Sequence, residues 1–259
     1  MKKEHVAMMK ARARNIVLTV AYDGTNYHGF QRQTKPNIIA VQNVLEEKLA
    51  MVFGDSIELA ASGRTDAGVH AYGQVVNFFT DGKIPIERVV RAVNSLLPSD
   101  IAVIAAREAD FEFSARHSAK SKTYVYKIQQ GAVPNPLTSR YAWYERRPLD
   151  IAKMQQALDK IVGTHDFSAF RASGGAPISP VRTMYEAMVE LEKDDIIKFT
   201  IHGSGFLYHM VRNIIGTVAS VGLGKLSVAD FSKILASRNR QNASATAPAC
   251  GLYLYKVEY

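Results

Sequence analysis

The 259-residue chain contains one cysteine, Cys250, and one tryptophan. A lone thiol cannot form an internal disulfide or a multi-thiolate zinc site, so we expect a reducing compartment, the cytoplasm. No apolar run is long enough to cross a bilayer, and we expect no membrane association. The seven histidines lack metal-ligand spacing, and neither a GxxxxGK[ST] loop nor a GxGxxG fingerprint occurs. We therefore expect no metal and no nucleotide cofactor.

Acidic residues are outnumbered by basic ones, 24 against 32, and the formal net charge is +8. Such an excess is typical of a protein with a phosphate-rich partner, most simply a nucleic acid. Apolar residues make up 47% of the chain, which predicts a globular protein. The length allows one large domain or two medium ones.

The first half of the chain shows an order of elements typical of a ferredoxin-like unit, β-α-β-β-α-β. β-branched residues and apolar periodicity carry this interpretation. The predicted strands are 14–22, 56–61, 74–79 and 101–106, and the predicted helices are 37–53 and 86–97, the latter ended by Pro98.

The second half repeats the order without a matching sequence repeat. We predict a strand at 122–128, a helix at 151–162, a hairpin of 184–192 with 196–202, a helix at 206–221, a helix capped by Ser227 and Asp230, and a final strand to 258. The predicted fold class is α+β, with two ferredoxin-like units whose sheets are antiparallel. The predicted divisions are a basic tail (1–13), an N-terminal domain (14–108) and a C-terminal domain (109–259).

The segment most suggestive of chemistry is 62–71, SGRTDAGVHA, between two predicted strands. Its glycines predict a turn that holds backbone amides and one carboxylate, Asp66, at a sheet edge. An aspartate before Ala-Gly is also a common turn residue, and the residues alone leave that interpretation open. Arg64 and the basic chain provide a cationic setting, which keeps a carboxylate ionised for use as a nucleophile or base.

Five motifs, in order, resemble the tRNA pseudouridine synthase A family. They are YDGTNYHGFQRQ (22–33), GRTDAGVH (63–70), KTYVY (122–126), FLYHMVRN (206–213) and APACGLYL (247–254). The resemblance extends from about residue 14 to the end. It implies an isomerase that converts uridines 38, 39 and 40 of the tRNA anticodon stem-loop to pseudouridine, without a cofactor, in the cytoplasm and as a homodimer.

The resemblance also implies roles for particular residues. Asp66 is the implied catalytic carboxylate, and Tyr124 stacks on the target base. The other implied substrate-binding residues are Arg64, Arg212 and Arg171, with Arg212 approaching Asp66 from the second unit across a central cleft. From the residues alone, Tyr124 is equally a strand aromatic, Arg212 a helix-surface charge, and Arg171 the start of a plain surface loop.

Three alternative functions remain open from sequence. A non-catalytic RNA-binding protein would use strand aromatics such as Tyr124 and leave Asp66 idle. A hydrolase would use Asp66 and His70 as acid and base. A related synthase would act on another RNA.

Overall fold

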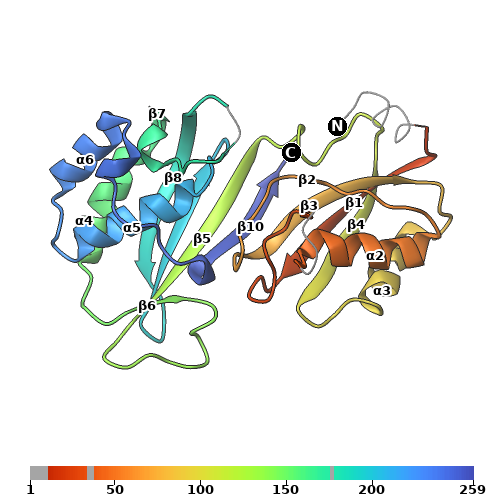
Figure 1. The fold of residues 1–259 in the computed structure, drawn as a ribbon, viewed down its shortest axis with the longest axis horizontal. Coiled ribbons are helices and arrows are strands. Elements are labelled where there is room, and N and C mark those ends of the chain that lie inside the picture. The colour runs from red at the N-terminus through yellow and green to blue at the C-terminus, as the bar shows by residue number, and fades with distance from the viewer. Residues whose placement is uncertain (1–10, 34–37, 176–177) are drawn as a thin grey trace. The chain divides into compact units, whose positions relative to one another are not determined.

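The structure is a computed structural model that describes residues 11–33, 38–175 and 178–259. It shows a mixed α/β fold with a large sheet (Figure 1). The chain forms two compact units: unit 1 runs to Ala119 and includes Leu254–Tyr259, and unit 2 is Lys120–Tyr253. The chain thus leaves unit 1 once and returns to it. Most of the predicted N-terminal tail lies outside the described residues.

The sheet of unit 1 follows the order β4-β1-β3-β10, and β2 pairs with another part of β3. Its strands are β1 (Arg14–Tyr22), β2 (Ala60–Ala61), β3 (His70–Thr80), β4 (Ile101–Ala109) and β10 (Leu252–Glu258). β1 runs antiparallel to both β3 and β4. Its register places Ile16 opposite Phe78 and Leu18 opposite Val76.

Two helices, α2 (Val41–Phe53) and α3 (Ile86–Asn94), pack on this sheet (Figure 1). Ile16 and Leu18 are fully buried, and the ring of Phe53 at the end of α2 meets Phe78 edge to face at 5.1 Å. This alternation of apolar residues, inward on every second position of β1, gives unit 1 its core.

Buried amides attach the segment after β4 to the sheet. Asn77 donates to Asn15 at 2.9 Å, and Asn15 donates to the carbonyls of Asp110 and Phe113. The Asn77 oxygen accepts from the amide of Ala115 at 2.8 Å. These bonds attach residues 110–115 to the sheet of unit 1.

Unit 2 contains a second antiparallel ladder in the order β5-β9-β8-β7, and β6 runs parallel to β5. Its strands are β5 (Ser121–Gln130), β6 (Trp143–Glu145), β7 (Gly163–Asp166), β8 (Val181–Leu191) and β9 (Ile196–Gly203). The predicted hairpin of β8 and β9 is confirmed, with Asp194 and Asp195 in the left-handed region at its turn.

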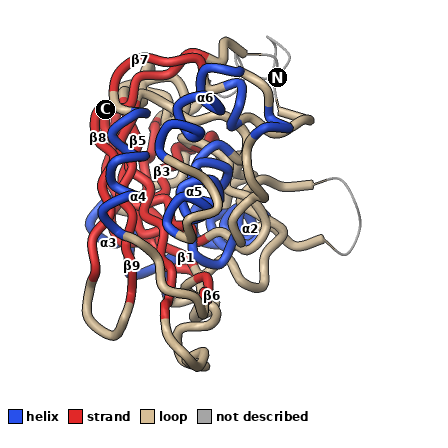
Figure 2. Tube along the Cα trace, turned by 90° about the vertical axis from the view of Figure 1, so that its left-hand side faces the viewer, coloured by secondary structure: helices blue, strands red, loops and turns tan. Residues whose placement is uncertain are grey.

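Three helices, α4 (Ile151–Leu158), α5 (Met210–Gly222) and α6 (Val228–Ser237), lie beside these strands (Figure 2). The side chain of Gln155 joins α4 to β8, because it accepts from the amide of Val189 and donates to the carbonyl of Ala187. Among the described residues, no helix is both long and apolar enough to span a membrane.

Element ends show the largest differences from the predictions. Helix α2 begins at Val41, not at residue 37, which lies outside the described residues, because Ala40 is extended. Helix α5 begins at Met210 because His209 has a φ of 59°. Only residues 60–61 of the predicted strand 56–61 join a ladder, and β6 and β7 were not predicted. The capping box of Ser227 and Asp230 is confirmed.

Asp55 provides a pH-dependent link between the end of α2 and the end of β3. Its carboxylate accepts from the amide of Asp81 at 3.0 Å, from Arg12 and from the hydroxyl of Thr80. The Asp81 amide and then the Arg12 guanidinium hold the pKa of Asp55 below its ordinary value.

We therefore expect Asp55→Asn to lower the melting temperature at neutral pH. A carboxyl with a lowered folded-state pKa stabilises the fold above its unfolded pKa, about 3.9, and that contribution is lost as the pH falls through the folded pKa. The difference in melting temperature between wild type and variant should shrink as the pH falls from about 5 toward 3. A difference that stays constant over this range would contradict the assignment.

Candidate active site

The Asp66 loop, residues 62–70, leads into β3 and lies against the segment that leaves β1. A Cβ atom on Gly24 would come within 2.0 Å of the Val69 carbonyl oxygen, and one on Gly29 within 2.5 Å of the Thr65 carbonyl oxygen. Gly29 also has a φ of 85°, which side chains disfavour. Glycine is therefore required at both positions for the two backbones to approach so closely.

Backbone hydrogen bonds fasten the two segments together. The amide of Phe30 donates to the carbonyl of Thr65 at 3.1 Å, and the amide of Gly68 donates to the carbonyl of Tyr27 at 3.3 Å. Within the loop, the amide of Val69 donates to the carbonyl of Asp66. The backbone that carries Asp66 is thus held from both sides.

Buried side chains hold the base of the same loop. The hydroxyls of Tyr22 and Thr65 lie 2.7 Å apart, and Ser62 donates to Gln74 at 2.7 Å. Gln74 in turn donates to the carbonyl of Gly63 at 2.9 Å. Burial raises the pKa of Tyr22 well above its ordinary value, so the phenol stays neutral and available for hydrogen bonding.

His70 lies at the end of the loop and is only 2% exposed. Its Nδ1 lies 3.1 Å from the amide nitrogen of Gly24 and 3.1 Å from Oδ1 of Asp23. The ring is therefore held against the turn after β1. This position disfavours the hydrolase alternative, in which His70 would exchange protons with a substrate.

The two predicted site residues of unit 1 share this loop. Asp66 is half-buried and Arg64 is exposed, while Thr65 between them is buried. The structure thus places Arg64 and Asp66 on either side of a buried threonine in the same loop.

Tyr124, the predicted stacking residue, lies on β5 opposite Ile201 of β9. Its ring is 8% exposed and contacts Phe206 edge to face, with centroids 4.9 Å apart. Phe206 belongs to the fourth of the sequence motifs, so this contact joins two motifs within unit 2. Tyr124 is therefore almost fully buried in the structure, with Phe206 as a packing partner.

Arg212 lies in the first turn of α5 and is fastened to the last of the five motifs. Its Nε donates to the carbonyl of Ala247 at 2.7 Å, and the amide of Ala247 donates to the carbonyl of Arg212 at 3.1 Å. Arg212 is thus half-buried, and its side chain is bonded to the backbone of a segment distant in sequence.

Asn213, next to Arg212, is fully buried and connects three segments of unit 2. It donates to the carbonyl of Phe170 at 2.8 Å and accepts from Arg240 at 3.0 Å and Thr246 at 2.6 Å. Because Phe170 directly precedes Arg171, the same side chain helps to position a second predicted site residue.

Arg171 is half-buried and donates to the carbonyl of Ile178 at 3.3 Å. The 171–180 loop is therefore partly fastened by this side chain; residues 176–177 lie outside the described part.

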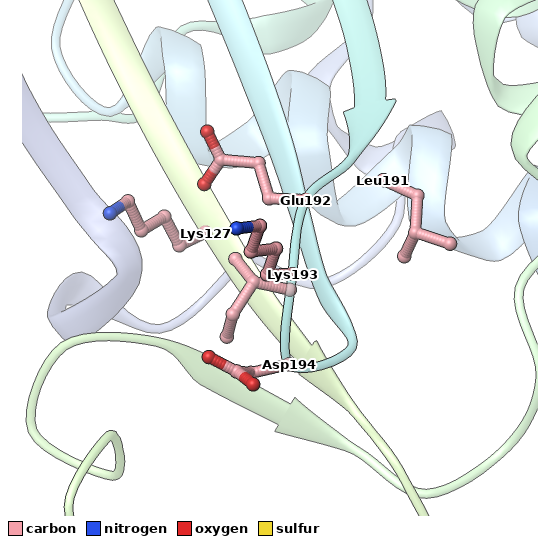
Figure 3. Close-up of a pocket in the computed structure, with 6 residues that line it drawn as sticks. Lys127, Leu191, Glu192, Lys193 and Asp194 are labelled. Carbon is pink, nitrogen blue, oxygen red and sulfur yellow. The ribbon is translucent and has the colours of Figure 1, made fainter.

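The described residues contain no group of three or more acidic, histidine or cysteine side chains placed to hold a metal ion. A shallow hollow at the β8–β9 turn is lined by Lys127, Leu191, Glu192, Lys193, Asp194 and Ile196 (Figure 3). Acidic and basic groups alternate around it, and it contains none of the predicted site residues.

Sequence reasoning missed most of the supporting residues. Tyr22, Gly24 and Gly29 lie in the first motif, and they act on the Asp66 loop some forty residues later. Gln74 and Asn213 are polar residues in otherwise apolar patterns, which is the one signal in sequence that marks such buried connections.

The profile of the tRNA pseudouridine synthase family matches residues 18–118 and 157–259. A tRNA pseudouridine synthase A of Thermoanaerobacter sp. (strain X514) is 46% identical over 246 residues, covering 95% of this chain and 100% of the relative. One from Clostridium kluyveri is 47% identical with the same coverage. One from Lacticaseibacillus casei is 45% identical, covering 93% of this chain and 98% of the relative.

Solved structures show a weaker similarity. A crystal structure of a Cbf5-Nop10-Gar1 complex matches with a TM-score of 0.38 and 13% identity, covering 92% of this chain and 57% of that chain. A structure of the archaeal box H/ACA sRNP Nop10-Cbf5 complex has a TM-score of 0.36 and 10% identity, covering 87% and 59%. Similarity at this level carries no argument about the site.

We expect Gly24→Ala to lower the free energy of unfolding by about 2 kcal/mol or more, since the added methyl would overlap the Val69 carbonyl. Urea unfolding followed by circular dichroism measures the loss. The matched control is Gly205→Ala, where the methyl would meet only ordinary contacts at 3.5 Å and beyond. Equal stability of the two variants would refute the close-approach argument.

Proposed function

The chain belongs to the tRNA pseudouridine synthase family, and from that membership we propose that it modifies uridines 38, 39 and 40 of the tRNA anticodon stem-loop with Asp66 as the catalytic carboxylate. Membership makes the protein an isomerase that acts on tRNA. The positions and the role of Asp66 are the proposal.

The observation that carries the role of Asp66 is the way its loop is held. Two glycine-dependent backbone contacts and the buried Tyr22–Thr65 and Ser62–Gln74 pairs fix the loop, while the Asp66 side chain itself stays half-buried. A catalytic group needs such support, because its position relative to the substrate must be fixed before the reaction begins. A plain turn residue needs no such support.

The reaction requires no redox cofactor. The bond between uracil N1 and ribose C1′ breaks, the uracil turns, and C5 bonds to C1′; the proton leaves C5, and N1 takes up a proton. Asp66 has three routes available: attack on C1′, attack on the base, or removal of a sugar proton to give a glycal. The proposal requires the carboxylate and leaves the route open.

The target base must leave its stack before this chemistry begins. We assign stacking on the exposed base to Tyr124, a contact worth about 1–3 kcal/mol per base. We assign binding of the RNA substrate to Arg64, Arg212 and Arg171. The pairing of Arg212 with Asp66 is proposed from the family resemblance. The +8 net charge agrees with an extended RNA partner.

Two ferredoxin-like units are part of the proposal. In unit 1, the element order β1-α2-β2-β3-α3-β4 and the strand order β4-β1-β3-β2 support this architecture. The order β5-α4-β8-β9-α5-β10 supports the same for the second unit, with β6 and β7 as additions. The functional domains 14–108 and 109–259, the central cleft, the homodimer and the cytoplasmic location also belong to the proposal.

The decisive comparison is Asp66→Asn against Asp194→Asn. Each variant replaces one carboxylate by its near-isosteric amide; Asp194 lies at the exposed β8–β9 turn (Figure 3), where asparagine tolerates the φ of 59°. We expect Asp66→Asn to lower tritium release from tRNA labelled at uridine C5 by about 10³-fold or more, and Asp194→Asn to retain the wild-type rate. Binding of tRNA should persist in both.

Other results would favour the alternatives. Release by both Asp66→Asn and wild type would show that another residue performs the chemistry. Absence of release by wild type on a mixed tRNA pool, with binding retained, would favour another RNA or a binding protein. Free uracil or cleaved RNA would indicate a hydrolase.

Two variants of Tyr124 separate its ring from its hydroxyl. If stacking is the main role, Tyr124→Phe should retain most activity, and Tyr124→Leu should lower kcat/KM about tenfold or more. A large loss in Tyr124→Phe would instead assign a role to the hydroxyl. Single-turnover tritium release makes the measurement, and melting temperatures control for damage to the packing on Phe206.

A further inference from the structure

Arg182, at the start of β8, is a half-buried arginine outside the five motifs. One terminal nitrogen of its guanidinium donates to the carbonyls of Ser179 and Val181, at 2.7 and 2.6 Å. No carboxylate of the described residues forms an ion pair with it. The charge is thus oriented by the backbone without being neutralised.

Arg171 and Arg182 are neighbours, because their guanidinium groups donate to the carbonyls of two consecutive residues, Ile178 and Ser179. Burial, followed by the positive charge of Arg171, lowers the pKa of Arg182 from its ordinary value. Lys198 of the same unit, in contrast, is neutralised, because it pairs with Glu190 at 2.8 Å and with Glu192 at 3.0 Å. Two neighbouring guanidinium groups are unfavourable alone and become favourable when an anion binds both.

An exposed aromatic ring borders the pair. A Cβ on Gly175 would lie 2.9 Å from Cβ of Tyr208 and 3.9 Å from Nε of Arg171, so Tyr208 and Arg171 are neighbours. The amide of Ala172 donates to the carbonyl of Tyr208 at 3.1 Å, and the Tyr208 side chain is 44% exposed. Tyr208 therefore lies near Arg171 and retains exposed surface for a further contact.

Gly205 lies next to the guanidinium of Arg182. A Cβ built on Gly205 would be 3.5 Å from Nε of Arg182, so a glycine at this position keeps a side chain away from that nitrogen. Both hydrogen bonds of Arg182 to described residues come from one terminal nitrogen, so the guanidinium has donors left for a phosphate oxygen.

Resting on the proposed function, we propose that Arg171 and Arg182 together bind one backbone phosphate of the RNA substrate, with Tyr208 against the adjoining nucleotide. Phosphate fits better than carboxylate, because it presents oxygens to two separate guanidinium groups at once. Such a contact positions the RNA without reading its sequence. Arg182 thereby gains a binding role that none of the motifs indicates.

The test measures tRNA affinity as a function of salt for wild type and Arg182→Gln. Each phosphate contact contributes about 0.7–0.9 to the slope of log K against log salt. We expect Arg182→Gln to reduce the slope by that amount and to weaken binding about 5- to 10-fold near 0.15 M salt. Arg182→Lys should keep the slope and recover part of the affinity, because it keeps the charge and loses the fork.

The matched control is Lys198→Gln, which removes the same formal charge from an ammonium already paired with two carboxylates. An equal decrease of slope in this control would attribute the effect to net charge and overturn the assignment. An unchanged slope in Arg182→Gln, accompanied by a lower melting temperature, would show that Arg182 only holds the carbonyls of residues 179 and 181.

Two further measurements test the role of Tyr208 and distinguish an RNA phosphate from free phosphate. Tyr208→Ala should weaken tRNA binding about fivefold or more, while Tyr208→Phe should retain it. Stabilisation of wild type but not Arg182→Gln by inorganic phosphate at matched ionic strength, without any change in the tRNA slope, would assign the pair to free phosphate and overturn the RNA assignment. Binding is read without turnover, so failure here is distinct from failure of Asp66 chemistry.

Discussion

The close approach of two backbones in unit 1 is the constraint on which the proposed active site depends. At Gly24 and Gly29, the segment after β1 touches the Asp66 loop with no room for a Cβ atom. Hydrogen bonds from Phe30 and Gly68 then lock the contact. The first motif thus fixes the backbone of the loop that carries the half-buried Asp66.

In unit 2, hydrogen bonds of polar side chains hold the segments that carry the predicted site residues. There the fully buried amide of Asn213 joins the carbonyl before Arg171 to Arg240 and Thr246, while Arg212 is clamped to Ala247. A buried amide with donors and acceptors satisfied is costly to disturb, because each lost bond leaves a desolvated polar group. Backbone contact holds the loop of Asp66, and a polar network holds the segments that carry Arg171 and Arg212.

Much of the fold was predictable because apolar periodicity reports which face of an element is buried. β1, the β8–β9 hairpin, the cap of α6 and β10 follow directly from local pattern. Local pattern does not contain the start of α5, where the left-handed His209 ends the preceding turn, or β6 and β7, which are short and depend on partner strands.

The site was predictable only in part, because local pattern does not show which distant residues meet in the fold. Asp66 and Arg64 lie in one short, unusual segment, so the sequence alone identifies them as candidate site residues. Tyr22 and Gln74 look like ordinary strand residues, and only the register of β1 with β3 brings them to the loop. The neighbouring sequence does not mark Arg182 as a binding residue. Its lowered pKa depends in part on Arg171, at the other end of the 171–180 loop.

The return of Leu254–Tyr259 to unit 1 has a consequence for biosynthesis. Tyr259 donates to the carbonyl of Ala115 and packs on Phe113, with ring centroids 4.9 Å apart. Because a ribosome makes the chain from its N-terminus, the whole of unit 2 is translated before these residues exist. Unit 1 therefore lacks β10, and the edge of β3 that pairs with β10 stays uncovered, until unit 2 has been synthesised. An unpaired strand edge invites association with other chains, so the interval between the two halves of unit 1 is when nascent protein most needs a chaperone.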